Sequence, residues 1–96
     1  MYFVTVVNQK PYRSRCWGYY ADESRAEQAV RENWTDMYEH GYYDLAVIEE
    51  ILEGVCALPE KARWFSVEMK DGDVYLVTEL ATPPDQFEHT CSFAIG

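Results

Sequence analysis

The dipeptide Asp71-Gly72 separates two stretches of alternating apolar and polar residues, and this arrangement predicts a β-hairpin over Arg63–Leu80. Counting outward from a two-residue turn places a mostly apolar set of pairs on one face: Met69 with Val74, Val67 with Leu76, and Phe65 with Thr78. The other face then pairs Glu68 with Tyr75, Ser66 with Val77, and Trp64 with Glu79. Because the turn and the apolar pattern agree on the register, we expect Phe65, Val67 and Leu76 to face the helix.

Other β-branched and aromatic stretches predict further strands, with a break at residues 8–11. Gly18 indicates a bulge or a close backbone approach within its strand. The apolar run at residues 45–48 is typical of a central strand with both faces covered, and Glu49 and Glu50 mark its expected exposed end. The expected strands are Tyr2–Val7, Arg15–Tyr20 antiparallel to it, Tyr43–Leu52, and a short edge strand over Thr90–Ile95.

One helix is predicted over Asp22–Glu39, because apolar residues recur there at spacings of three and four. Its N-terminus carries a possible capping box of Ser24 and Glu27, with Asp22 as the competing cap. His40 and Gly41 are expected at its end, with an interruption conceivable at residues 35–36. The apolar stripe consists of Ala26, Ala29, Val30, Trp34, Met37 and Tyr38.

These elements predict an α+β fold: an antiparallel sheet of four to six strands, with one main helix (about 22–39) packed on one face. The chain has 96 residues, which is the size of a single domain, here 1–96. Apolar residues make up 48% of it, too many for disorder despite the charge.

The formal net charge of −9 argues against direct binding to nucleic acid, whose phosphates an acidic surface repels. It fits a basic protein partner, mimicry of DNA, or simple solubility. No apolar run is long enough to span a membrane, and no signal peptide is evident. Three widely spaced cysteines without a CxxC motif indicate neither a disulfide framework nor a zinc site, so we expect reduced thiols in a cytosol.

The sequence carries no specific catalytic or metal-binding pattern, so we expect no enzyme, no cofactor and no metal. His89 and Cys91 share a strand face in principle, but nothing indicates that the thiol is activated. His40 and His89 have no metal-ligand spacing. Glu49 and Glu50 are adjacent, so they point to opposite faces of a strand and cannot act together as a glycosidase pair.

Binding chemistry is concentrated in Arg15-Cys16-Trp17-Gly18-Tyr19-Tyr20, where an arginine and three aromatics occupy six residues. Arginine forms bidentate contacts with phosphate or carboxylate, and aromatic rings stack on planar ligands. The same residue types suit a protein–protein hot spot, or simply the packing of a strand. The candidate ligand-binding residues are Arg13, Arg15, Trp17, Tyr19, Tyr42, Tyr43 and Trp64.

The order of motifs along the chain resembles a family of small acidic proteins, about a hundred residues long, from phages, prophages and mobile elements of Firmicutes. The motifs are Arg15-Cys16-x-Gly-Tyr-Tyr, Ala-Val-x-x-Asn from Ala29, Tyr43-x-x-Ala-Val-Ile-Glu-Glu, Glu53-Gly54, Trp64-Phe65 and a terminal Ser-Phe-Ala-Ile-Gly. The resemblance implies a phage-type context but no defined activity. Since such proteins often counter host immunity, it makes Arg15 and residues 18–20 the first site candidates.

Together these features predict a non-catalytic, homo-oligomeric protein in the host bacterial cytosol that antagonises immunity by sequestering a small nucleotide-like signal. The excess of aromatic residues underlies the expectation of self-association. One alternative is an inhibitor that binds a host defence protein directly, resembling an anti-CRISPR protein or an acidic DNA mimic. A second alternative is a hydrolase of an immune nucleotide signal.

Overall fold

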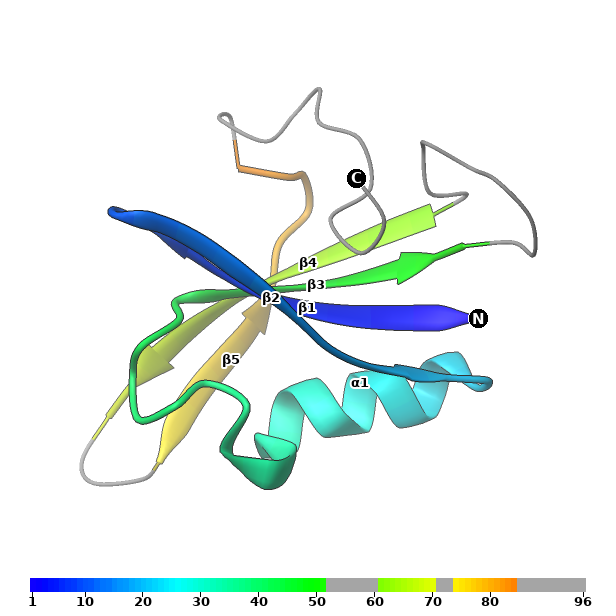
Figure 1. Ribbon diagram of the computed structural model, residues 1–96, viewed down its shortest axis with the longest axis horizontal. Coiled ribbons are helices and arrows are strands. Elements are labelled where there is room, and N and C mark those ends of the chain that lie inside the picture. Colours follow the sequence, from blue (N-terminus) through cyan, green and yellow to red (C-terminus); the bar gives the residue numbers. More distant parts are fainter. Residues whose placement is uncertain (52–60, 71–73, 85–96) are drawn as a thin grey trace.

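The computed structural model describes residues 1–51, 61–70 and 74–84, which form one antiparallel sheet of five strands with one α-helix against it (Figure 1). The predicted α+β class is therefore confirmed. The Asp71-Gly72 turn, the Thr90–Ile95 strand, Cys56, His89 and Cys91 lie outside the described residues. The strand order is β2-β1-β3-β4-β5, and the strands are β1 (Tyr2–Gln9), β2 (Tyr12–Tyr20), β3 (Leu45–Glu50), β4 (Lys61–Met69) and β5 (Tyr75–Glu79).

β1 and β2 form the predicted antiparallel pair, with each strand longer than expected. The register shifts between Val4 and Thr5, since Val4 pairs with Gly18 and Thr5 pairs with Cys16. Trp17 is the extra residue of a bulge, as the glycine beside it indicated. The bulge changes which side chains of β2 share a face, and this matters for the candidate site.

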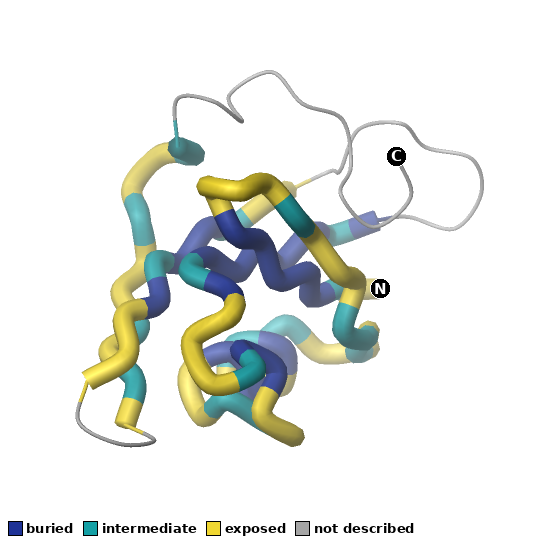
Figure 2. Tube along the Cα trace, turned by 60° about the vertical axis from the view of Figure 1, so that its left-hand side comes forward, coloured by how far each residue is buried: buried dark blue, intermediate teal, exposed yellow. Residues whose placement is uncertain are grey.

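β3 is the central strand of the described sheet, and its apolar residues are buried on both faces, as predicted. Figure 2 shows this concentration of buried residues in the middle of the sheet. The expectation that Glu49 marks an exposed end is wrong, because Glu49 is only 2% exposed. It pairs with Phe3 of β1 and Ala62 of β4, so it lies inside the sheet; β4 begins at Lys61, earlier than predicted.

The β4–β5 hairpin is confirmed, but its predicted register is wrong by one residue. Val67 pairs with Val77 and Met69 with Tyr75, and the Lys70 N–H donates to the Val74 carbonyl at 2.7 Å. Val77 therefore packs against the helix-side core and Leu76 is 50% exposed. Residues 74–77 are all apolar, so the sequence pattern fitted either register.

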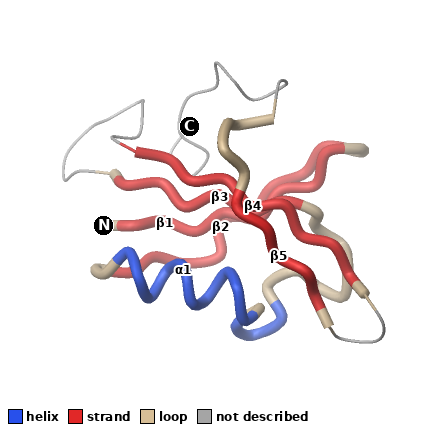
Figure 3. The backbone as a smooth tube through the Cα atoms, turned by 180° about the vertical axis from the view of Figure 1, so that it is seen from behind, coloured by secondary structure: helices blue, strands red, loops and turns tan. Residues whose placement is uncertain are grey.

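The helix α1 (Glu23–Glu32) is shorter than predicted and covers one face of the sheet (Figure 3). Asp22 is its N-cap, since its side chain accepts a hydrogen bond from the Ser24 N–H at 3.0 Å. The helix ends at Asn33, which adopts a left-handed conformation with φ 53° and donates its N–H to the Ala29 carbonyl. The predicted end at His40 and Gly41 is thus wrong. No helix of the described residues is long and apolar enough to cross a membrane.

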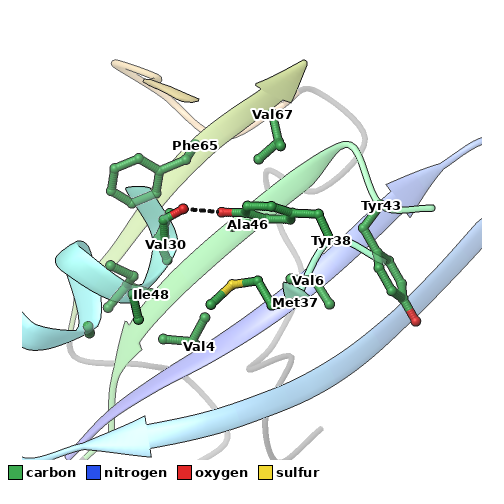
Figure 4. Close-up of a cluster of buried hydrophobic side chains, with 12 residues drawn as sticks. Val4, Val6, Val30, Met37, Tyr38, Tyr43, Ala46, Ile48, Phe65 and Val67 are labelled. Carbon is green, nitrogen blue, oxygen red and sulfur yellow. Dashed lines mark hydrogen bonds between the residues drawn. The ribbon is translucent and has the colours of Figure 1, made fainter. Parts of the chain in front are cut away.

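Residues 33–43 leave the helix as an irregular segment that returns to the sheet, starting with the 3₁₀ turn η1 (Trp34–Asp36). Met37 and Tyr38 are fully buried among Val4, Val6 and Phe65, so the predicted apolar stripe was correct although its second half is not α-helical (Figure 4). The Tyr38 hydroxyl donates to the Val30 carbonyl at 2.6 Å. This hydrogen bond ties the segment to the last turn of α1.

An ion-pair network joins α1 to β4 and β5 at the same face. Arg63 binds both carboxylate oxygens of Glu79, at 2.8 and 2.7 Å, and lies 3.0 Å from Glu27 and 3.2 Å from Glu23. Arg31 pairs with Glu27 at 2.9 Å. These contacts hold α1 in place, and thereby fix where the 33–43 segment begins.

Candidate functional site

Arg13, Arg15 and Trp17 lie on one face of β2, which is an edge strand of the described sheet. Alternation along the strand places Arg13, Arg15 and Trp17 on the same side, because the bulge changes the alternation only after Trp17. This is the face that α1 and the 33–43 segment cover, since Val4 and Val6 of the neighbouring β1 point into the helix-side core. The segment therefore meets the arginines directly.

Arg13 is held by Tyr42 at the end of this segment. Its guanidinium carbon lies 3.5 Å from the centre of the Tyr42 ring, and its Nη2 donates to the Tyr42 carbonyl at 2.8 Å. Tyr43 packs edge-on against Tyr42, with ring centres 5.0 Å apart. The Arg13 Nε is buried and makes no hydrogen bond with any of the described residues. Arg13 is thus fixed by stacking and by one strong donor contact.

Arg15 lies farther out, and 60% of its side chain is exposed. Its guanidinium carbon is 4.9 Å from the centre of the Trp17 ring, so the guanidinium makes a cation–π contact with the indole. Its Nη1 contacts one carboxylate oxygen of Glu39 at 3.4 Å, and this is its one carboxylate partner among the described residues. Arg15 therefore presents most of its donors to solvent.

Trp17 is half-buried and contacts both Arg15 on β2 and Thr35 in the 33–43 segment. Its indole N–H donates to the Thr35 hydroxyl at 2.8 Å, while its ring packs against the helix-side core. The indole is a platform for Arg15 and an anchor for the segment. Tyr42, which is 47% exposed, is the aromatic ring of this cluster most available to a ligand.

The pKa of Tyr43 is shifted by burial and by the charged side chains of the cluster. Burial raises the pKa of its hydroxyl, the Glu39 carboxylate adds to this rise, and Arg15 and Arg13 act in the opposite direction. In Figure 4 its ring points away from the other labelled core side chains. The structure thus brings together Arg13, Arg15, Trp17, Tyr42 and Tyr43, five of the predicted site residues.

Two predicted site residues lie elsewhere. Tyr19 falls on the opposite face of β2, because the bulge at Trp17 breaks the simple alternation, and its ring packs 5.7 Å from that of Phe3. Trp64 is 5% exposed and packs on the face of the sheet away from α1, with Val7, Leu45 and Val47. Neither side chain contributes to the site around Arg15.

Sequence reasoning missed Thr35 and Glu39, which complete the cluster. The predicted helix ran through Glu39, and Thr35 was considered only as part of an interruption of that helix, so neither residue was assigned to the site. The signal that was available is Asn33, a residue that adopts left-handed conformations readily and often ends a helix. Thr35, Asp36, Glu39 and His40 also have positive φ, between 48° and 58°, which is uncommon for residues other than glycine.

The described residues contain no group of three or more His, Cys, Asp or Glu side chains arranged to hold a metal ion. Cys16 is an exposed free thiol on β2, and burial of part of the side chain raises its pKa. A raised pKa leaves less thiolate at neutral pH, so the thiol is a poor nucleophile. The groups that the structure places around Arg15 are guanidinium and aromatic side chains, which suit recognition by charge and by aromatic surface.

Comparison of the chain with protein-family models, with curated proteins and with solved structures found no match. The resemblance to phage proteins thus stays a prediction, and the case for a function depends on the geometry around Arg15.

Proposed function

We propose that this chain is a non-catalytic binding protein that captures a small, planar, anionic ligand of the nucleotide type at the Arg15 site. The observation that carries the proposal is that Arg15 and Trp17 share one face of the edge strand β2 with Arg13, and that Arg13 holds Tyr42 of the 33–43 segment against this face. Arg15 is exposed and lies over the Trp17 ring, so its guanidinium can form two parallel hydrogen bonds with a phosphate or carboxylate group. Tyr42 is 47% exposed, and since Arg13 covers one face of its ring, a base would stack on the part of the ring that Arg13 leaves open.

The charge of the remaining surface supports a site at this position. The chain carries 17 acidic and 8 basic residues, so an anion is repelled over most of the molecule. Arg13 and Arg15 are the cationic side chains of β2, and no acidic residue occurs on that strand. An anionic ligand is therefore directed to the β2 edge.

In the phage-type context implied by the sequence motifs, capture of such a ligand would remove an immune signal from the cytosol of the host bacterium. Sequestration needs no chemical step, and it agrees with a cluster of arginine and aromatic side chains that Thr35 and Glu39 complete. Self-association stays part of this proposal, since a second copy covering the exposed edge strand would enclose the ligand more fully.

Direct binding to a defence protein is the second candidate, and the exposed tyrosines on the other face of β2 favour it. Tyr12 and Tyr19 are 58% and 63% exposed. Tyrosine is enriched in protein–protein hot spots. These two rings lie on the face of β2 opposite Arg15, so they cannot contact a small ligand bound at Arg15.

The test is incubation of the protein with a panel of mono-, di- and cyclic nucleotides, followed by removal of the protein, heat release and chromatography. Sequestration predicts depletion of one nucleotide from solution and its recovery intact after heating. A chemically altered product would contradict the proposal in favour of a hydrolase. Depletion of no nucleotide would contradict it in favour of a protein target.

A further inference from the structure

Two arginines of this molecule make very different contacts with their carboxylates. Arg63 engages both oxygens of Glu79, at 2.8 and 2.7 Å, which is the bidentate geometry of a strong pair. Arg15 touches a single oxygen of Glu39, at 3.4 Å. The contact of Arg15 is long and one-sided, so a bidentate oxyanion would bind the guanidinium better than Glu39 does.

The contact between Glu39 and Arg15 is weak enough for a ligand anion to replace the Glu39 carboxylate. Its side chain is 38% exposed and that of Arg15 is 60% exposed, so solvent reaches the pair and its strength is low. The Glu39 backbone has φ 48° and is followed by His40 at 58° and Gly41 at 90°. The segment returns to the sheet through this left-handed turn, which directs the Glu39 carboxylate to Arg15 instead of into bulk solvent.

From these contacts we propose that Glu39 is a built-in competitor at the ligand site, an inference that rests on the proposed binding function. In the free protein its carboxylate occupies the position of the ligand anion at Arg15. Ligand binding replaces this single contact with the two parallel hydrogen bonds of a phosphate or carboxylate. Anions that cannot bind in this forked manner gain little over Glu39, so the competitor selects for terminal phosphate or carboxylate groups.

The experiment is calorimetric titration of the full chain with AMP, which carries a planar base and a terminal phosphate. Glu39→Gln removes the competing charge and keeps the size of the side chain, so AMP should bind about two- to fivefold more tightly, the range expected for loss of an exposed ion pair. Glu68→Gln is the matched control: it removes one negative charge from β4, where Glu68 contacts Lys70 at 3.1 Å. Its affinity for AMP should equal that of the wild type.

The outcomes distinguish the role of Glu39 as a competitor from the binding of a ligand at Arg15. Tighter binding by Glu39→Gln alone supports the competitor, including the case in which only this variant binds AMP measurably. Equal or weaker binding by Glu39→Gln, with AMP still bound by the wild type and lost in Arg15→Ala, overturns the competitor and leaves the binding function standing. Absence of AMP binding to wild type and Glu39→Gln up to millimolar concentration overturns both.

Discussion

The substitution Tyr38→Phe tests the docking of the 33–43 segment, on which the candidate site depends. Tyr38 is fully buried, and its hydroxyl donates to the Val30 carbonyl at 2.6 Å (Figure 4). Val30 lies in the last turn of α1, where carbonyls have no partner within the helix. Phenylalanine keeps the ring and removes the donor, so one buried carbonyl loses its partner.

An unsatisfied buried carbonyl costs about 1–3 kcal/mol, and the more apolar ring offsets part of this, so we expect a loss of about 1–2 kcal/mol. For a chain of 96 residues each kcal/mol lowers the melting midpoint by about 4–8 °C. Circular dichroism during heating, together with urea unfolding, measures both quantities. Tyr42→Phe is the control, because Tyr42 is 47% exposed and should change stability by less than about 0.5 kcal/mol. Identical midpoints for Tyr38→Phe and wild type would refute the placement of the segment.

Three further predictions concern the sheet, the ion pairs and assembly. Val77→Ser should lower the melting midpoint because Val77 packs on the core, whereas Leu76→Ser at a 50% exposed position should leave it nearly unchanged; the reverse order would refute the observed register. A hydrogen bond from Arg63 lowers the pKa of Glu79 below its ordinary 4.5, so this pair stabilises the fold above that pH and the contribution is lost as the pH falls through the lowered value. Glu79→Gln should therefore cost about 0.5–1 kcal/mol in urea unfolding at pH 7 and progressively less as the pH falls below 4.5, and a cost independent of pH would contradict this. Sedimentation at tens of micromolar should detect self-association, and a monomer there would remove the oligomer from the proposal.

The fold could be predicted to a useful degree because its elements follow local patterns. The apolar stripe on residues 26–38 identified buried side chains correctly even where the backbone is not helical, since burial depends on which residues are apolar. The path of the chain after Asn33 could not be predicted in the same way. It depends on left-handed conformations at Thr35, Asp36, Glu39 and His40 that residue type alone does not favour.

The candidate site was predicted in part for related reasons. The spacing of Arg13, Arg15 and Trp17 put them on one face of a strand, and the neighbouring tyrosines at 42 and 43 are brought to them by the segment. Tyr19 was misplaced because a bulge moves every later side chain of the strand to the other face. Leu76 was misplaced because the register of β4 and β5 differs by one residue from the register that a two-residue turn predicts.

The central claim is that Arg15 binds the anionic group of a ligand, and the most direct test is ligand affinity for Arg15→Ala measured beside its melting curve. Arg25→Ala is the control, because it removes the same charge from the exposed side of α1. With a nucleotide recovered from the panel, Arg15→Ala should lose about 1.5–3 kcal/mol of binding free energy through lost charge-assisted hydrogen bonds, with a nearly unchanged melting midpoint. Equal affinity of Arg15→Ala, Arg25→Ala and wild type would contradict the claim.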